Sequence, residues 1–214
     1  AGLHGVEGKS SVDRYYAIGL TYANGPLNLA AVVDQTNFST TKWNGVDWGN
    51  PVDDALTVTV GGNYDFQVVK LYAGAQYFDN ADLNSIDNIF SKDFALSPAQ
   101  TERFQVKGYG LTIGADIPAA GGTFKVATSY LDGTIDKVNG WDMATAIGAT
   151  FGEIDISRWN TSAGYLYSLS KRTSLYGVAS YSYQTVKGQK DFNGYSLDVA
   201  PTVIEVAAGI VHKF

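Results

Sequence analysis

Large apolar residues alternate with small or polar residues along nine segments of this chain. Successive side chains of a β-strand point to opposite faces of a sheet, so a period of two predicts strands rather than helices. Valine, isoleucine, tyrosine, threonine and phenylalanine fill the segments, as strands prefer. The fold class is therefore all-β, with strands predicted over residues 12–22, 26–36, 55–64, 66–78, 104–116, 122–131, 157–168, 172–184 and 202–213.

Short and long connections alternate strictly between these strands. Short turns are predicted at 23–25, at Asp65, at 118–121 and at 169–171, where Gly, Asn, Asp, Pro or Ser occur. Long polar loops are predicted over 37–54, 79–103, 132–156 and 185–201. Within the second of these, residues 79–92 fit either a polar loop or a short helical turn. Short turns at one end and long loops at the other are typical of outer-membrane barrels.

One face of the predicted strands is continuously apolar and includes Leu20, Val58, Leu71 and Phe124. The opposite face carries Gly, Ser, Thr, Ala, Gln and an occasional charge. In a soluble barrel or sandwich the apolar face is a dry core, and the other face normally carries many Lys and Glu. In a membrane barrel the apolar face meets lipid, and aromatic residues lie at the two interfaces. The polar face carries few charges, and tyrosines lie near the strand ends. Both features favour the membrane interpretation.

Composition supports this interpretation and excludes several alternatives. Charged residues make up 17% of the 214 residues, against roughly 25% in an average soluble domain. With no cysteine, neither a disulfide framework nor a thiol enzyme is expected. The formal net charge of -6 and the lack of a basic run argue against nucleic acid as a partner. No apolar stretch approaches the roughly 18 residues of a membrane-spanning helix.

The predicted number of strands raises a question of closure. A spanning sheet must close on itself because lipid offers no hydrogen bonds. Nine antiparallel strands leave one parallel pair in a closed ring. We therefore expect residues 1–214 to form a single outer-membrane β-barrel domain that is the C-terminal part of a longer barrel. A miscounted strand is the competing explanation.

Three stretches carry a family resemblance, namely 15–27, 167–176 and the ending Gly209–Phe214. They resemble the general porins of β-proteobacteria, and the likeness runs along the whole chain. This resemblance implies a 16-stranded, water-filled, trimeric diffusion channel, of which the chain would supply the last nine strands. It also implies a multi-pass location in the Gram-negative outer membrane, with lipid and lipopolysaccharide around it. The closing strand, with Ile210 and Phe214, is then the signal for the barrel-assembly machinery.

A porin filters small hydrophilic solutes by the size and charge of its lumen. Charges in the polar register of the predicted strands are therefore the candidate pore-lining residues: Lys70, Lys125, Arg158, Asp34 and Glu205. Lys70 and Lys125 sit among small residues, although each also fits a side chain that snorkels at an interface. Arg158 also fits a charge at the rim. Lys107 falls in the apolar register, so it lies either above the bilayer or beside a β-bulge.

Other chemistry is weakly supported. The two histidines are His4 in an opening loop and His212, which alternates into the apolar register. No catalytic, cofactor-binding or metal-binding residue is predicted, although the acidic run 79–88 offers oxygen ligands of the kind that Ca²⁺ prefers. The alternative functions are a soluble all-β carbohydrate- or ligand-binding module and an outer-membrane barrel enzyme or adhesin.

Overall fold

The computed structural model describes residues 14–37, 42–43, 46–47, 53–82, 105–135, 153–188 and 197–213. No helix among these residues has the length and apolarity that crossing a membrane requires. The strands in this part of the chain are β1 (Arg14–Asn24), β2 (Leu27–Asn37), β3 (Lys42–Trp43), β4 (Val46–Asp47), β5 (Ala55–Asp65), β6 (Lys70–Asp82), β7 (Gln105–Ala119), β8 (Gly122–Ile135), β9 (Ile154–Ser168), β10 (Thr173–Gly188), β11 (Leu197–Val199) and β12 (Thr202–His212).

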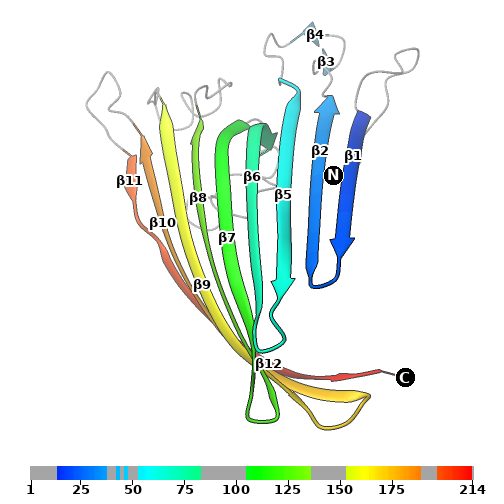
Figure 1. Ribbon diagram of the computed structural model, residues 1–214. Helices are drawn as coiled ribbons and strands as arrows, with labels where there is room; N and C mark the ends of the chain where they lie inside the picture. Colours follow the sequence, from blue (N-terminus) through cyan, green and yellow to red (C-terminus); the bar gives the residue numbers. More distant parts are fainter. Residues whose placement is uncertain are drawn as a thin grey trace.

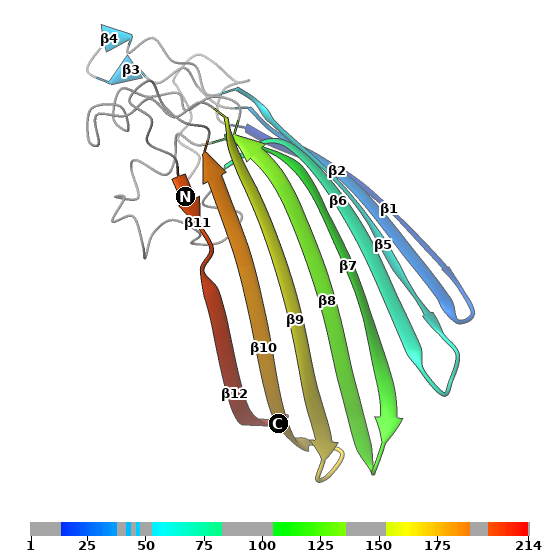
Figure 2. The ribbon, with the colours of Figure 1, turned by 90° about the vertical axis from the view of Figure 1, so that its left-hand side faces the viewer.

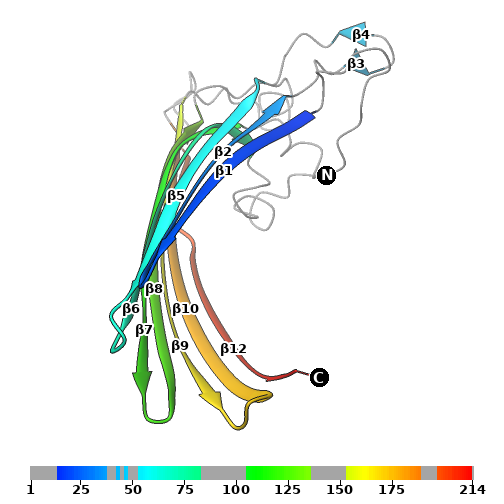
Figure 3. The same cartoon turned by 45° about the vertical axis from the view of Figure 1, so that its right-hand side comes forward.

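The long strands form one antiparallel sheet in sequence order, β1-β2-β5-β6-β7-β8-β9-β10, and both β11 and β12 pair with β10. The predicted all-β antiparallel architecture is therefore confirmed. The sheet is twisted and curved, and it is open, with β1 at one edge and β12 at the other (Figures 1 and 3). All four short turns lie at one end of the sheet (Figure 2), as the alternation of connection lengths predicted.

The turns differ in detail from the predicted ones. Asp65 belongs to β5, and the turn that follows it spans 66–69, closed by the Phe66 N–H donating to the Val69 carbonyl at 2.9 Å. The Asp65 carboxylate accepts a 2.7 Å bond from the Gln67 N–H, which is how aspartate favours a turn after itself. Between β7 and β8 the turn is reduced to Ala120 and Gly121, both at positive φ.

Four strands extend several residues further toward the long loops than predicted. β6, β8 and β10 run on to Asp82, Ile135 and Gly188, and β9 begins at Ile154. Residues 79–82 are thus strand, and the rest of the segment considered for a helical turn lies outside the described residues. The small pair β3–β4 and the short β11 were not predicted. At the loop-side ends of the long strands, apolar and polar residues do not alternate clearly. These residues are in strands because they pair with the neighbouring strands.

The apolar face of the sheet is the register that contains Leu20, Leu111, Ile113, Ile204 and Val206. The relative exposure of Leu20 is 75% and that of Val206 is 78%. Leu71 and Phe124 are also exposed, and Val58 is half-buried. These side chains therefore do not form a dry interior within the described chain, which is what a soluble sandwich would require.

The opposite, polar face departs from prediction near the long-loop end. There it carries a buried apolar cluster formed by Phe78, Ala81, Val106, Ile135, Ile154, Ile156 and Val186. Register confirms a common face, because Gly108, Gly133, Ile156 and Val186 follow one another across β7 to β10. Most of these positions fall within the predicted long loops. The expectation that this face carries small and polar residues holds only for the part of the sheet nearer the short turns.

Candidate pore-wall site

Four charged residues form a row across the polar face near the short turns. The cross-strand partners run Asp65 (β5), Lys70 (β6), Asp116 (β7) and Lys125 (β8). Direct cross-strand neighbours of opposite charge attract one another. The row brings Lys70 and Lys125, two of the predicted pore-lining residues, to either side of a single carboxylate.

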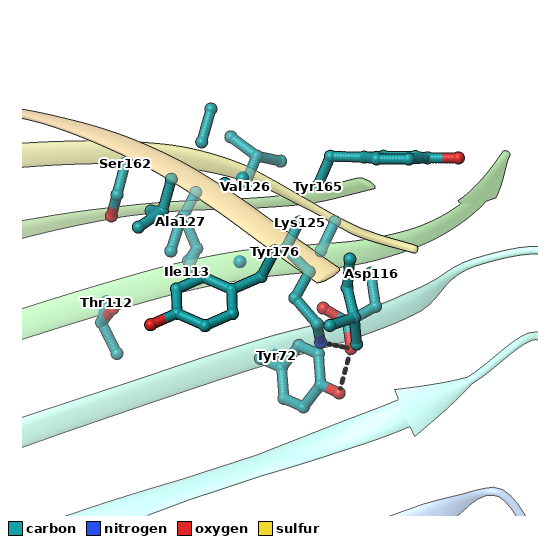
Figure 4. Close-up of a pocket in the computed structure, with 17 residues that line it drawn as sticks. Tyr72, Thr112, Ile113, Asp116, Lys125, Val126, Ala127, Ser162, Tyr165 and Tyr176 are labelled. Atoms are coloured by element: carbon teal, nitrogen blue, oxygen red, sulfur yellow. Dashed lines mark hydrogen bonds and ion pairs between the residues drawn. The ribbon is translucent and has the colours of Figure 1, made fainter. Parts of the chain in front are cut away.

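Asp116 is the centre of this row (Figure 4). Its Oδ2 atom lies 2.5 Å from the Lys125 ammonium and accepts a 2.9 Å bond from the Tyr72 hydroxyl. The Lys70 ammonium lies 5.5 Å from the centre of the Tyr72 ring, a cation–π distance. Asp116 is not among the predicted pore-lining residues, although it follows Thr112 and Gly114 in the polar register of its strand.

The other predicted pore-lining residues lie apart from this row. Asp34 pairs in register with Ala17 and Thr57. Arg158 is opposite Gln184, toward the long-loop end. Glu205 lies on β12 and accepts a 3.3 Å bond from the Ser180 hydroxyl. All three occupy the polar register.

Uncharged polar groups cover much of the same face. Asn28 donates to Asn63 at 3.2 Å, and Gln76 donates to Thr59 at 3.0 Å. Asn160 donates to Ser182 at 2.6 Å. These amides and hydroxyls are groups that water can also solvate, so this face suits contact with an aqueous space.

The apolar face is bounded by aromatic residues at both ends. The loop-side aromatic row consists of Tyr77, Tyr109, Tyr130, Trp159 and Tyr183. The ring centre of Tyr130 lies 6.4 Å from that of Tyr109 and 6.0 Å from that of Trp159. The turn-side aromatic row consists of Tyr22, Tyr64, Phe124, Tyr165 and Tyr167. Six to eight residues separate the rows, roughly 20–27 Å along a strand. Outer-membrane barrels carry an apolar band of about 25 Å between aromatic girdles.

Lys107 lies on the apolar register, beyond Tyr109 toward the loops. Its ammonium is 3.5 Å from the Asp79 carboxylate, and its side chain is 53% exposed. The strand register shifts between Phe78 and Ala81, directly across from it. The predicted bulge is therefore present, and the charge lies outside the aromatic row.

The histidines, the acidic run and the two residues of the assembly signal are the remaining candidates. His212 lies on the apolar register, with Nδ1 2.9 Å from the Thr173 hydroxyl. No group of three or more His, Cys, Asp or Glu in the described chain is placed to hold a metal ion. His4, Phe214 and residues 83–88 of the acidic run lie outside the described residues, whereas Ile210 is 63% exposed on β12.

An antiparallel sheet with an exposed apolar face between aromatic rows and a polar opposite face is the wall of a β-barrel membrane protein. A family model described as Gram-negative porin matches residues 2–189, and the chain belongs to this family. Membership of this family implies a location in the Gram-negative outer membrane.

Two known proteins show how far the likeness extends. The chain is 30% identical over 210 residues to an outer membrane porin protein of Bordetella pertussis. The aligned residues make up 97% of this chain and 48% of that protein. The structure is also similar to that of an anion-selective porin from Comamonas acidovorans, with a TM-score of 0.57 and 22% sequence identity. The superposed part covers 99% of this chain and 52% of the porin chain. The chain thus spans about half the length of these relatives, and the second likeness concerns the fold alone.

Proposed function

We propose that the described sheet forms part of the wall of a water-filled channel through which small hydrophilic solutes and ions diffuse passively across the outer membrane. The observation that carries this proposal is the contrast between the two faces of the same strands. A soluble protein rarely leaves so large an apolar face in water. Lipid is the natural partner of the apolar face, and water in a lumen is the natural partner of the polar face.

The proposed mechanism is filtration without chemistry. Charges on the polar face raise the local concentration of solutes of opposite sign and exclude those of like sign. We assign this role to Lys70, Lys125, Arg158, Asp34 and Glu205, and add Asp116, which neutralises part of the charge of the two lysines. The strands cross the bilayer several times in this proposal, and no residue acts as a catalyst.

The proposed partners follow from the same assignment. Lipid and lipopolysaccharide contact the apolar face, and the channel assembles as a homotrimer. The exposed Ile210 on β12, together with Phe214, serves as the signal for the barrel-assembly machinery. Nothing in the described chain favours the soluble binding module or the outer-membrane enzyme.

Charge reversal at Lys125 tests the proposal. The intact protein is inserted in planar bilayers, and the reversal potential is measured in a salt gradient. Lys125→Glu should shift the permeability ratio toward cations, whatever its starting value, by about threefold or more. Lys187→Glu is the matched control, because Lys187 is exposed on the apolar register near the loops. An absence of conductance steps, or equal shifts in both variants, contradicts the proposal.

A further inference from the structure

A groove of about 410 Å³ lies on the polar face beside the charge row. We call it the tyrosine groove, lined by Tyr72, Asp116, Lys125, Ser162, Tyr176 and Val178. Figure 4 shows Tyr72 and Tyr176 from different strands, with Lys125 and Asp116 close to Tyr72. Pockets that hold small organic molecules typically measure about 300–1,000 Å³. The groove is therefore large enough for a small organic solute.

The charged end of the groove offers an ammonium rather than a carboxylate. The Lys125 side chain is 49% exposed, whereas that of Asp116 is 23% exposed. Asp116 Oδ2 already accepts from Lys125 and from the Tyr72 hydroxyl, whereas an ammonium has three donors. Lys70 lies on the other side of Asp116, between that carboxylate and Asp65, so Lys125 is the cation of the groove itself. An anionic group is the partner that this end of the groove favours.

The rest of the groove suits an apolar ring. Its floor is made of small residues, among them Gly114, Ala127 and Gly164, so a flat molecule can approach the backbone closely. The Tyr176 ring fills the space that a side chain would take at Gly209, because a Cβ built there lies 2.8 Å from ring carbons. The Tyr72 ring, which Asp116 holds close to Lys125, provides a surface against which a ring can stack. A small inorganic ion would use only the ammonium.

We propose that the tyrosine groove is a binding site for small carboxylates that carry an apolar ring, with the carboxylate on Lys125 and the ring between Tyr72 and the small residues of the floor. This inference rests on the proposed channel function and names a class of solute that the wall retains in passage. Such a site slows the permeation of ring carboxylates relative to aliphatic ones, and a retained molecule transiently blocks the ion current.

Current block in planar bilayers tests the site in the intact protein. Benzoate should half-block the current at a concentration at least tenfold lower than acetate, benzyl alcohol or benzylamine. Lys125→Gln removes the anionic contact, and Ala127→Phe fills the groove while both charges remain. Each should raise the benzoate concentration for half-block about tenfold. Lys187→Gln and Tyr167→Ala are matched controls, since both residues are exposed on the apolar register, and they should change it less than twofold.

The possible results separate this inference from the function on which it rests. If benzoate and acetate block the current equally, the inference is overturned. The proposed channel function still stands in that case, because the protein conducts. Stronger block by benzylamine than by benzoate also overturns it, because Asp116 would then be the contact. Unchanged block in Ala127→Phe overturns the groove as the location. A protein without conductance refutes the proposed function itself.

Discussion

Ile113 and Thr112 are neighbours in β7 that point to opposite faces, so they test the assignment of those faces directly. Ile113 is 62% exposed and lies midway between Tyr109 and Ile117, the cross-strand partner of Phe124. An arginine at the midplane of a lipid-facing strand costs about 2–4 kcal/mol. Loss of lipid contact over the exposed part of the isoleucine adds about 1–2 kcal/mol. Ile113→Arg should therefore destabilise the inserted protein by about 3–6 kcal/mol.

Thr112→Arg places the same side chain on the polar face of the same strand. Thr112 is exposed there, so the guanidinium reaches water and the expected change is below about 0.5 kcal/mol. The assay is urea-dependent refolding of the intact protein into lipid vesicles, followed by electrophoretic mobility without heating. A difference of 3–6 kcal/mol corresponds to a factor of roughly 10²–10⁴ in the folding equilibrium. Equal destabilisation by the two variants, or a larger effect of Thr112→Arg, refutes the assignment of the faces.

Two further predictions concern packing and use the same refolding assay. Gly108→Ala should destabilise the sheet by about 1–3 kcal/mol, because a Cβ there clashes with the Asp132 carbonyl oxygen; Gly177→Ala, where nothing lies within 4 Å of the new atom, should not. Comparable stability of these two variants contradicts the close approach of β8 to Gly108. Ile135→Ala should cost about 2–5 kcal/mol, because Ile135 is fully buried in the apolar cluster and its truncation leaves a cavity. Ile204→Ala should cost less, because this side chain is 72% exposed and lipid can fill the space, so a larger loss at Ile204 would argue against a tightly packed cluster.

The alternation along the chain was sufficient to predict the nine long strands and the division of their side chains between two faces. This succeeded because period-two patterning is a local property, and one face of every long strand is apolar. The pattern also put Lys70 and Lys125 on the polar face. It did not single out Asp116, because a residue becomes the centre of a charge row only through the register of three strands.

The buried apolar cluster is a feature that the alternation along the chain did not predict. Phe78, Val106, Ile135 and Ile154 lie on the face that is polar elsewhere, and their segments lack the clear alternation of the strand centres. The sequence by itself determined the all-β class, the two-faced strands and the likeness to porins, since each depends on residues close together in the chain. Only the tertiary structure decided how far the strands extend, which charges become neighbours and where the tyrosine groove forms. These depend on cross-strand register, which joins residues far apart in sequence through hydrogen bonds that no local pattern specifies.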